Sequence, residues 1–157
     1  MLFLDLDDTL LSSDMSISET NLEAIKKASD AGANIVICTG RGIFSVKHIA
    51  QQLGVDNGYI ICLNGGAVYK GFPPVLTKEN LFESSSAVEI YKAAKKYGVD
   101  IQIYRDDRLI VENISERVKA YIDKLSAEYT VVDSIEEYDG KISKILLNGP
   151  NELLLKI

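Results

Sequence analysis

The sequence predicts an α/β fold in which a parallel sheet is followed by a second, α+β unit. Two observations support this. Near the N-terminus, three short apolar runs alternate with segments of helical periodicity, which is the strand–helix order of a right-handed parallel sheet. The later part of the chain alternates apolar and polar residues, which is typical of antiparallel strands with one solvated face.

The first unit is predicted to begin with an apolar strand, and a glycine follows each of its two predicted helices. Ser16 or Ser18 can cap the first helix, Gly32 ends it, and Gly54 ends the second. The predicted elements are a strand over residues 2–6, a helix over 16–32, a strand over 35–38, a helix over 43–53 and a strand over 59–63.

The second unit begins after a loop rich in glycine and proline at residues 70–74. Ser86 and Glu89 fit a capping box at the start of a helix, and Gly98 fits its end. We place the boundary so that residues 1–74 form one unit and residues 75–157 the other. The predicted elements are a hairpin over 67–76, helices over 84–97 and 115–128, strands over 100–104, 109–111, 130–132 and 141–147, and a last helix from about 150.

Composition narrows the classes of function. The 157 residues carry a net charge of −6, which argues against nucleic acid or an anionic membrane as a partner. No apolar run has membrane-spanning length, and the N-terminus lacks the pattern of a signal peptide. Cys38 and Cys62 lie in apolar runs and are expected to be core thiols. A cytoplasmic protein is the expectation.

Polar and glycine-rich groups follow each strand of the first unit. Parallel strands bring their carboxyl ends to one edge of the sheet, where ligands bind. Each segment alone also fits an ordinary turn or helix cap, but their occurrence in order after three strands favours a site. The first pair of acids suits Mg²⁺ or general acid–base chemistry. The segments are Asp5/Asp7/Asp8/Thr9, Thr39-Gly40-Arg41 and Asn64-Gly65-Gly66.

These segments resemble motifs of the haloacid dehalogenase-like superfamily, in its Cof-type phosphatase branch. Asp8 stands where the first motif usually has glycine. The resemblance covers the whole chain: it implies the N-terminal half of a Rossmann-like, three-layer core over 1–74 and an inserted, incomplete α+β cap over 75–157. The motifs read Asp5-Leu6-Asp7-Asp8-Thr9-Leu10-Leu11, Cys38-Thr39-Gly40-Arg41 and Leu63-Asn64-Gly65-Gly66-Ala67.

The resemblance also implies roles. Asp5 would be the nucleophile that forms an aspartyl-phosphate, and Asp7 the general acid and base. The Asp5 carboxylate and the Asp7 backbone carbonyl would hold Mg²⁺. Thr39 and the N–H groups from Gly40 onward would bind phosphoryl oxygens of a small phosphorylated metabolite. For Arg41 and Asn64, substrate contact and a purely structural role both stay open.

Two motifs expected after the cap are missing: a lysine and an acidic cluster that completes the Mg²⁺ site. Nothing in residues 141–157 resembles the acidic cluster, and Lys144 lies in a cap-like strand, so we do not assign it the role of the lysine. We therefore expect a fragment of a longer phosphatase, with little or no hydrolysis by these residues alone. The first strand would also be an open sheet edge, through which self-association is an alternative.

Two other classes compete with the enzyme. One is a non-catalytic binding or scaffold remnant of a phosphatase. The other is a receiver-type phosphoacceptor domain, which would need an aspartate where the chain has Asn64 and would leave the second unit unexplained.

Overall fold

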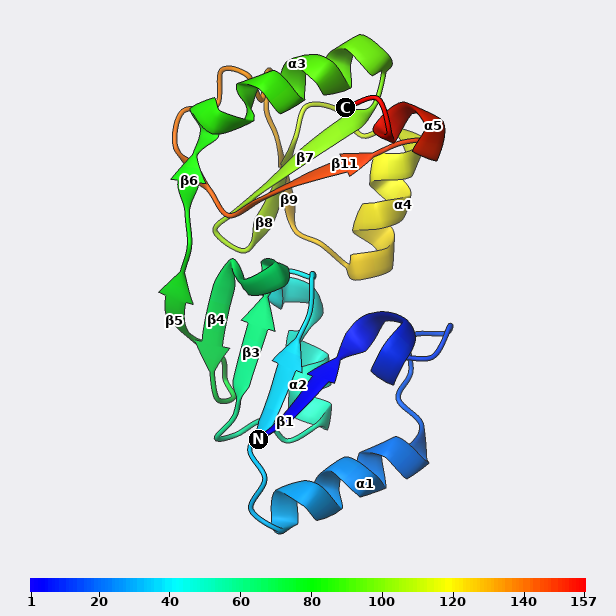
Figure 1. Ribbon diagram of the computed structural model, residues 1–157, viewed down its shortest axis with the longest axis vertical. Coiled ribbons are helices and arrows are strands. Elements are labelled where there is room, and N and C mark those ends of the chain that lie inside the picture. Colours follow the sequence, from blue (N-terminus) through cyan, green and yellow to red (C-terminus); the bar gives the residue numbers. More distant parts are fainter. The chain divides into compact units, whose positions relative to one another are not determined.

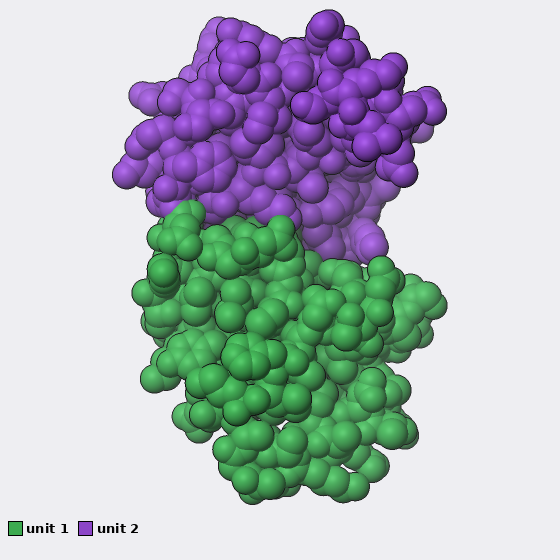
Figure 2. All heavy atoms as spheres, viewed as in Figure 1, with its two compact units in different colours: residues 1–80 green, residues 81–157 purple.

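The computed structural model describes residues 1–157, which divide into two compact units, Met1–Asn80 and Leu81–Ile157 (Figures 1 and 2). The division falls after Asn80 rather than after Pro74 because residues 75–79 form a strand that pairs within the first unit. No helix has both the length and the apolar character needed to cross a membrane.

The first unit is built on a five-stranded sheet in the order β1-β2-β3-β4-β5. The first three strands are parallel, with Asp5 opposite Cys38 and Cys38 opposite Ile61, so their carboxyl ends share one edge. The last two strands are antiparallel additions, and β1 lies at the open side of the sheet. The strands are β1 (Leu2–Asp5), β2 (Ile35–Cys38), β3 (Tyr59–Cys62), β4 (Ala67–Lys70) and β5 (Val75–Glu79).

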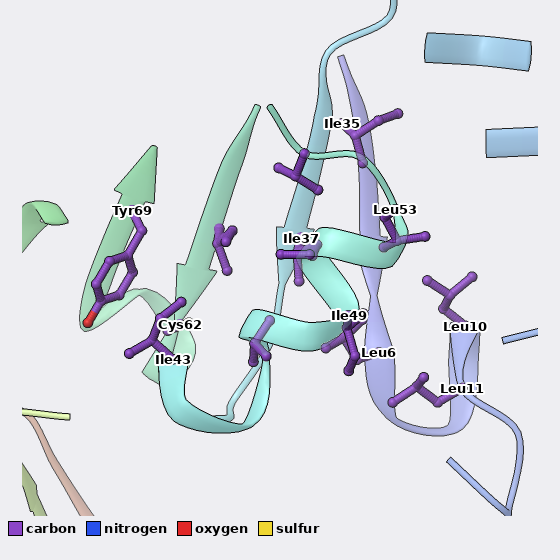
Figure 3. Packing of buried hydrophobic residues seen from close by; sticks show 14 of the residues in the cluster. Leu6, Leu10, Leu11, Ile35, Ile37, Ile43, Ile49, Leu53, Cys62 and Tyr69 are labelled. Atoms are coloured by element: carbon purple, nitrogen blue, oxygen red, sulfur yellow. The ribbon is translucent and has the colours of Figure 1, made fainter. Parts of the chain in front are cut away.

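One face of this sheet is covered by the helices α1 (Glu19–Asp30) and α2 (Lys47–Gln52). Ile37 of β2 packs with Ile49 and Leu53 in a single apolar cluster, which Figure 3 shows from close by. Alternation along β1 puts Leu2 and Leu4 against this cluster, while Phe3 is 60% exposed. The prediction of an α/β unit with a parallel sheet is confirmed.

The predicted continuous helix over 43–53 is wrong. The segment forms a 3₁₀ turn, η2 (Ile43–Ser45), followed by the short helix α2. The Ser45 hydroxyl donates to the Gly42 carbonyl, 3.1 Å away, and so stabilises the tight turn.

The second unit holds a four-stranded sheet, β11-β7-β8-β9, and a short pair, β10-β6. The strands β11, β7 and β8 are antiparallel, and β9 joins β8 in parallel after α4. The elements are β6 (Phe82–Glu83), α3 (Val88–Tyr97), β7 (Asp100–Arg105), β8 (Arg108–Val111), α4 (Glu116–Leu125), β9 (Tyr129–Val131), β10 (Lys141–Ile142), β11 (Lys144–Asn148) and α5 (Asn151–Leu154).

Two details of this unit differ from prediction. The sheet has no solvated face at β7, because Ile103 packs in the cluster with α3 while Gln102 and Tyr104, on the other face, are also buried. The capping box at Ser86 and Glu89 is also absent, since the 3₁₀ turn η4 (Ser84–Ala87) leads directly into α3.

Candidate active site

Asp5 is the last residue of β1, and the chain turns sharply after it. Leu6 and Leu10 are buried and anchor the turn, which is closed by a hydrogen bond of 2.9 Å from Leu11 N–H to Leu6 O. The Thr9 hydroxyl donates to Asp5 Oδ2 at 2.8 Å. Thr9 thereby orients the carboxylate at the sheet edge.

Asp8 stands where the first motif usually has glycine, and its backbone conformation is compatible with this substitution. Its backbone lies in the left-handed region, at φ 55° and ψ 14°. Glycine adopts this conformation at no steric cost, and aspartate tolerates it better than most residues. The substitution therefore preserves the turn that the chain makes after Asp7.

Backbone hydrogen bonds join the loops after β2 and β3. Thr39 N–H donates to Ile61 O at 2.9 Å, and Asn64 N–H donates to Thr39 O at 3.2 Å. Leu63 N–H donates to Arg41 O at 3.0 Å. These bonds place the second and third predicted segments side by side.

Gly40 and Asn64 approach each other closely. The backbone of Asn64 is left-handed, with φ 56°, and its Oδ1 lies 2.9 Å from the point that a β-carbon on residue 40 would occupy. A real β-carbon essentially never makes so short a contact, so the arrangement depends on glycine at position 40.

A pocket of about 300 Å³ lies at this edge of the sheet. Four predicted site residues line it: Asp5, Thr39, Gly40 and Asn64. The other lining residues are Cys38, Ile61 and Gly65. Three strand ends that are distant in sequence thus contribute to one concave site.

Cys38 was missed by the sequence reasoning, which placed it in the core. Burial, and secondarily the negative charge of Asp5, raise the pKa of the Cys38 thiol, so this half-buried group stays protonated at neutral pH. The predicted parallel pairing of the first two strands could have revealed this position, because it places Cys38, at the end of one strand, opposite Asp5, at the end of the other.

Asp7 and Arg41 form a two-point ion pair instead of lining the pocket. Arg41 Nε donates to Asp7 Oδ2 at 2.9 Å, and Nη2 donates to Asp7 Oδ1 at 2.5 Å. The Arg41 side chain is 5% exposed and that of Asp7 49%. Arg41 thus contacts a protein carboxylate, and its contact with substrate stays a prediction.

The donors suit Mg²⁺ only in part. The Asp5 carboxylate and the Asp7 backbone carbonyl are the hard oxygen ligands that this ion prefers, and Mg²⁺ commonly completes its shell with water and phosphate. No group of three or more His, Cys, Asp or Glu side chains is placed to hold a metal. These residues therefore supply only some of the oxygen ligands that a Mg²⁺ ion needs.

Comparison with known proteins decides the family. The profile of the haloacid dehalogenase-like hydrolases matches residues 2–157. The chain belongs to this family. The resemblance seen in its three motifs is thereby confirmed.

Individual relatives give the range of similarity. The chain is 36% identical over 108 residues to the 5-amino-6-(5-phospho-D-ribitylamino)uracil phosphatase YwtE of Bacillus subtilis, a match covering 68% of the chain and 36% of YwtE. It is 26% identical over 110 residues to the pyridoxal phosphate phosphatase YbhA of Escherichia coli, covering 70% of the chain and 40% of YbhA.

A solved haloacid dehalogenase-like hydrolase from Bacteroides thetaiotaomicron shares the fold. Its TM-score is 0.82 at 22% identity, with 98% of this chain and 59% of that chain covered. The chain thus spans less than two thirds of the length of each of these relatives.

Proposed function

We propose that this hydrolase is a Mg²⁺-dependent phosphatase that acts on a small phosphorylated metabolite through an aspartyl-phosphate at Asp5. The observation that carries the proposal is the convergence of Asp5, Thr39 and Asn64 on one pocket at the carboxyl edge of the sheet. Phosphatase names among the relatives, including enzymes of phosphorylated ribitylaminouracil and pyridoxal phosphate, support the substrate class.

In the proposed first step, an Asp5 carboxylate oxygen attacks phosphorus in line and the bond to the substrate alkoxide breaks. Asp7 gives a proton to the departing alkoxide. In the second step Asp7 takes a proton from water, whose oxygen attacks the same phosphorus. The bond from phosphorus to Asp5 then breaks, releasing inorganic phosphate and restoring the carboxylate.

The remaining residues bind and orient the phosphoryl group. The Thr39 hydroxyl and backbone N–H groups of the loop are hydrogen-bond donors at the pocket wall, and the Asn64 carboxamide is a further candidate contact. Bound Mg²⁺, held by the Asp5 carboxylate and the Asp7 backbone carbonyl, would offset the repulsion between carboxylate and phosphate.

The test compares the chain with Asp5→Asn in two assays. Beryllofluoride, a mimic of the phosphoryl group, is titrated with and without Mg²⁺ and followed by ¹⁹F NMR. Hydrolysis of p-nitrophenyl phosphate is measured alongside, with EDTA as the metal-free control. We expect Mg²⁺-dependent trapping that Asp5→Asn abolishes, and slow hydrolysis.

Two results would change the conclusion. Absence of trapping in a folded chain would overturn the phosphatase proposal and favour the non-catalytic remnant. Rapid turnover that Asp5→Asn abolishes would support the function but disprove the expectation that these residues alone hydrolyse little.

A further inference from the structure

Lys144 lies on β11, an edge strand of the sheet in the second unit, and its side chain is half-buried. It stands opposite Tyr104 of β7, and its Nζ lies 5.2 Å from the centre of the Tyr104 ring. We propose that Lys144 is an acylation site, at which a small activated acyl group is transferred to Nζ and converts the ammonium into a neutral amide.

The surroundings of Lys144 disfavour its charged form. Tyr104 is 2% exposed, and its hydroxyl shares a hydrogen bond of 2.5 Å with the hydroxyl of Tyr121. Burial, and secondarily Tyr121, raise the pKa of Tyr104, so its ring carries no negative charge at neutral pH. The ring face attracts the ammonium of Lys144, but burial lowers the pKa of this lysine. The uncharged amine is therefore more populated here than at an exposed lysine.

Other lysines of the same unit are held as ammonium ions by carboxylates. Lys95 Nζ lies 2.8 Å from Glu112, and this hydrogen bond raises the pKa of Lys95. Lys119 Nζ lies 2.8 Å from Asp123, with the same effect on its pKa. Only an uncharged amine has the electron pair that attacks an acyl carbon. Lys144 is therefore expected to be the more nucleophilic amine.

The face of the sheet that carries Lys144 and Tyr104 also carries Gln102, two residues earlier on β7. Gln102 is 0% exposed, and neither the nitrogen nor the oxygen of its carboxamide has a hydrogen-bond partner in the protein. The residues opposite it on the neighbouring strands, Leu146 and Val111, are apolar. A buried carboxamide without a partner destabilises the fold, so a group that pairs with it would be favoured at this face.

An acyl group on Lys144 supplies such a partner. The amide that forms has one N–H and one C=O, which complement the oxygen and the nitrogen of the Gln102 carboxamide. Lys144 is the diagonal neighbour of Gln102 across the pair of β7 and β11, a separation that long side chains span. Acylation also removes the positive charge, so the half-burial of this side chain costs less. Both effects favour the acylated product at position 144.

The reaction requires only an acyl donor with a good leaving group, which an acyl phosphate and a thioester both provide. The electron pair of Nζ attacks the acyl carbon, and the bond from that carbon to the leaving oxygen or sulfur breaks. Phosphate or thiolate departs with the electrons of that bond, and one proton of the amine passes to solvent. No oxidant or reductant takes part.

The first experiment treats the full chain with acetyl phosphate and, separately, with the thioester S-acetyl-N-acetylcysteamine. Peptide mass spectrometry follows the acetylation of each lysine. We expect Lys144 to react about threefold or more faster than Lys141. Lys141 is the matched control, because it lies three residues away with a side chain that is 58% exposed and an Nζ 3.7 Å from Glu83.

The outcomes of this experiment separate the fold from the local sequence. In guanidinium chloride the two rates should become equal, and a preference that persists in the unfolded chain would contradict the role of the folded surroundings. Equal rates in the folded chain with both donors would overturn the proposal. A preference for Lys144 with one donor only would support it and identify the leaving group.

The second experiment incorporates Nε-acetyl-lysine at position 144 or at position 141 by codon suppression and measures unfolding in urea. We expect the midpoint to rise by about 0.3 M or more for position 144 and to change little for position 141. In the Gln102→Leu background the gain should disappear, because the amide has lost its partner. Gln102→Met serves the same comparison if Gln102→Leu does not fold.

Two results would contradict the fit of the acyl group. A midpoint that falls or does not move for position 144 would show that the sheet face does not accommodate the amide. A gain that persists without the Gln102 carboxamide would overturn the pairing of Gln102 with the acylated side chain.

Discussion

Asn64 Oδ1 lies 2.9 Å from the position of a β-carbon on residue 40, so the side chain of Asn64 packs where only glycine leaves room. This contact joins the loop after β2 to the loop after β3 at the wall of the pocket. The two segments that the sequence marked separately are therefore one structural unit.

Gly40→Ala should destabilise the chain by about 1 kcal/mol, because the new methyl group displaces the exposed Asn64 carboxamide from its place against the loop after β2. The urea midpoint measures this. Asn64→Gly is compatible with the left-handed backbone at position 64 and removes the obstructing side chain. In that background Gly40→Ala should cost less than about 0.5 kcal/mol; an unchanged cost would show that the contact is not responsible.

The hydrogen bond from Thr9 to Asp5 should matter for anion binding. Thr9→Val keeps the shape of the side chain but removes the donor at 2.8 Å from Asp5 Oδ2. We expect a loss of about tenfold in Mg²⁺-dependent beryllofluoride affinity, the size of one hydrogen bond to a charged group. Thr9→Ser retains the hydroxyl and should recover most of it. Equal losses in the two variants would point to packing rather than to the donor.

A carboxylate in the second unit should make stability depend on pH. Burial of Glu112 would raise its pKa, but hydrogen bonds from Lys95, Tyr91 and the Ile135 N–H together bring the pKa below its ordinary 4.5. The ionised form is thus favoured by folding. Its stabilisation is present above the ordinary pKa and is lost as pH falls through the lowered value.

Glu112→Gln should therefore lower the free energy of unfolding at pH 7 by about 1–2 kcal/mol and flatten its fall in acid. Thermal unfolding between pH 2 and pH 7 measures both effects. Glu136→Gln is the matched control, since Glu136 only meets Lys92 at 3.7 Å on an exposed surface. That change should cost less than about 0.5 kcal/mol. Similar curves for the two variants would contradict the role given to Glu112.

Local patterns in the sequence predicted the elements well because they depend on nearest neighbours. Ile35–Cys38 matches its predicted strand, and Ser18 caps α1 through its hydroxyl. The parallel order of the strands then made the meeting of Asp5, Thr39 and Asn64 predictable from topology alone.

Long-range partners were not predictable in the same way. The pairing of Asp7 with Arg41 spans 34 residues, and no periodicity reveals it or the left-handed turn at Asp8 that follows. Alternation predicts a solvated position for Gln102, yet it is 0% exposed. Tyr104, on the same face of β7, is hydrogen-bonded to Tyr121 of α4, a contact that alternation cannot encode. Tertiary packing determines which distant side chains meet, and a single sequence contains little information about that packing.

The last prediction concerns Gly58, which begins the approach to β3. A β-carbon there would lie 1.8 Å from the backbone carbonyl oxygen of Ile35, and Ile35 is 2% exposed in β2. The obstacle is backbone in a packed sheet, so it cannot rotate away as a side chain would. Gly58→Ala should cost about 3 kcal/mol or more, or prevent folding. Circular dichroism and urea unfolding report both outcomes.

Asn57→Ala, at the exposed neighbouring position, should stay within about 0.5 kcal/mol of the wild type. If Gly58→Ala were as stable as Asn57→Ala, the close approach of Gly58 to β2 would be wrong, and with it the path by which the chain enters β3.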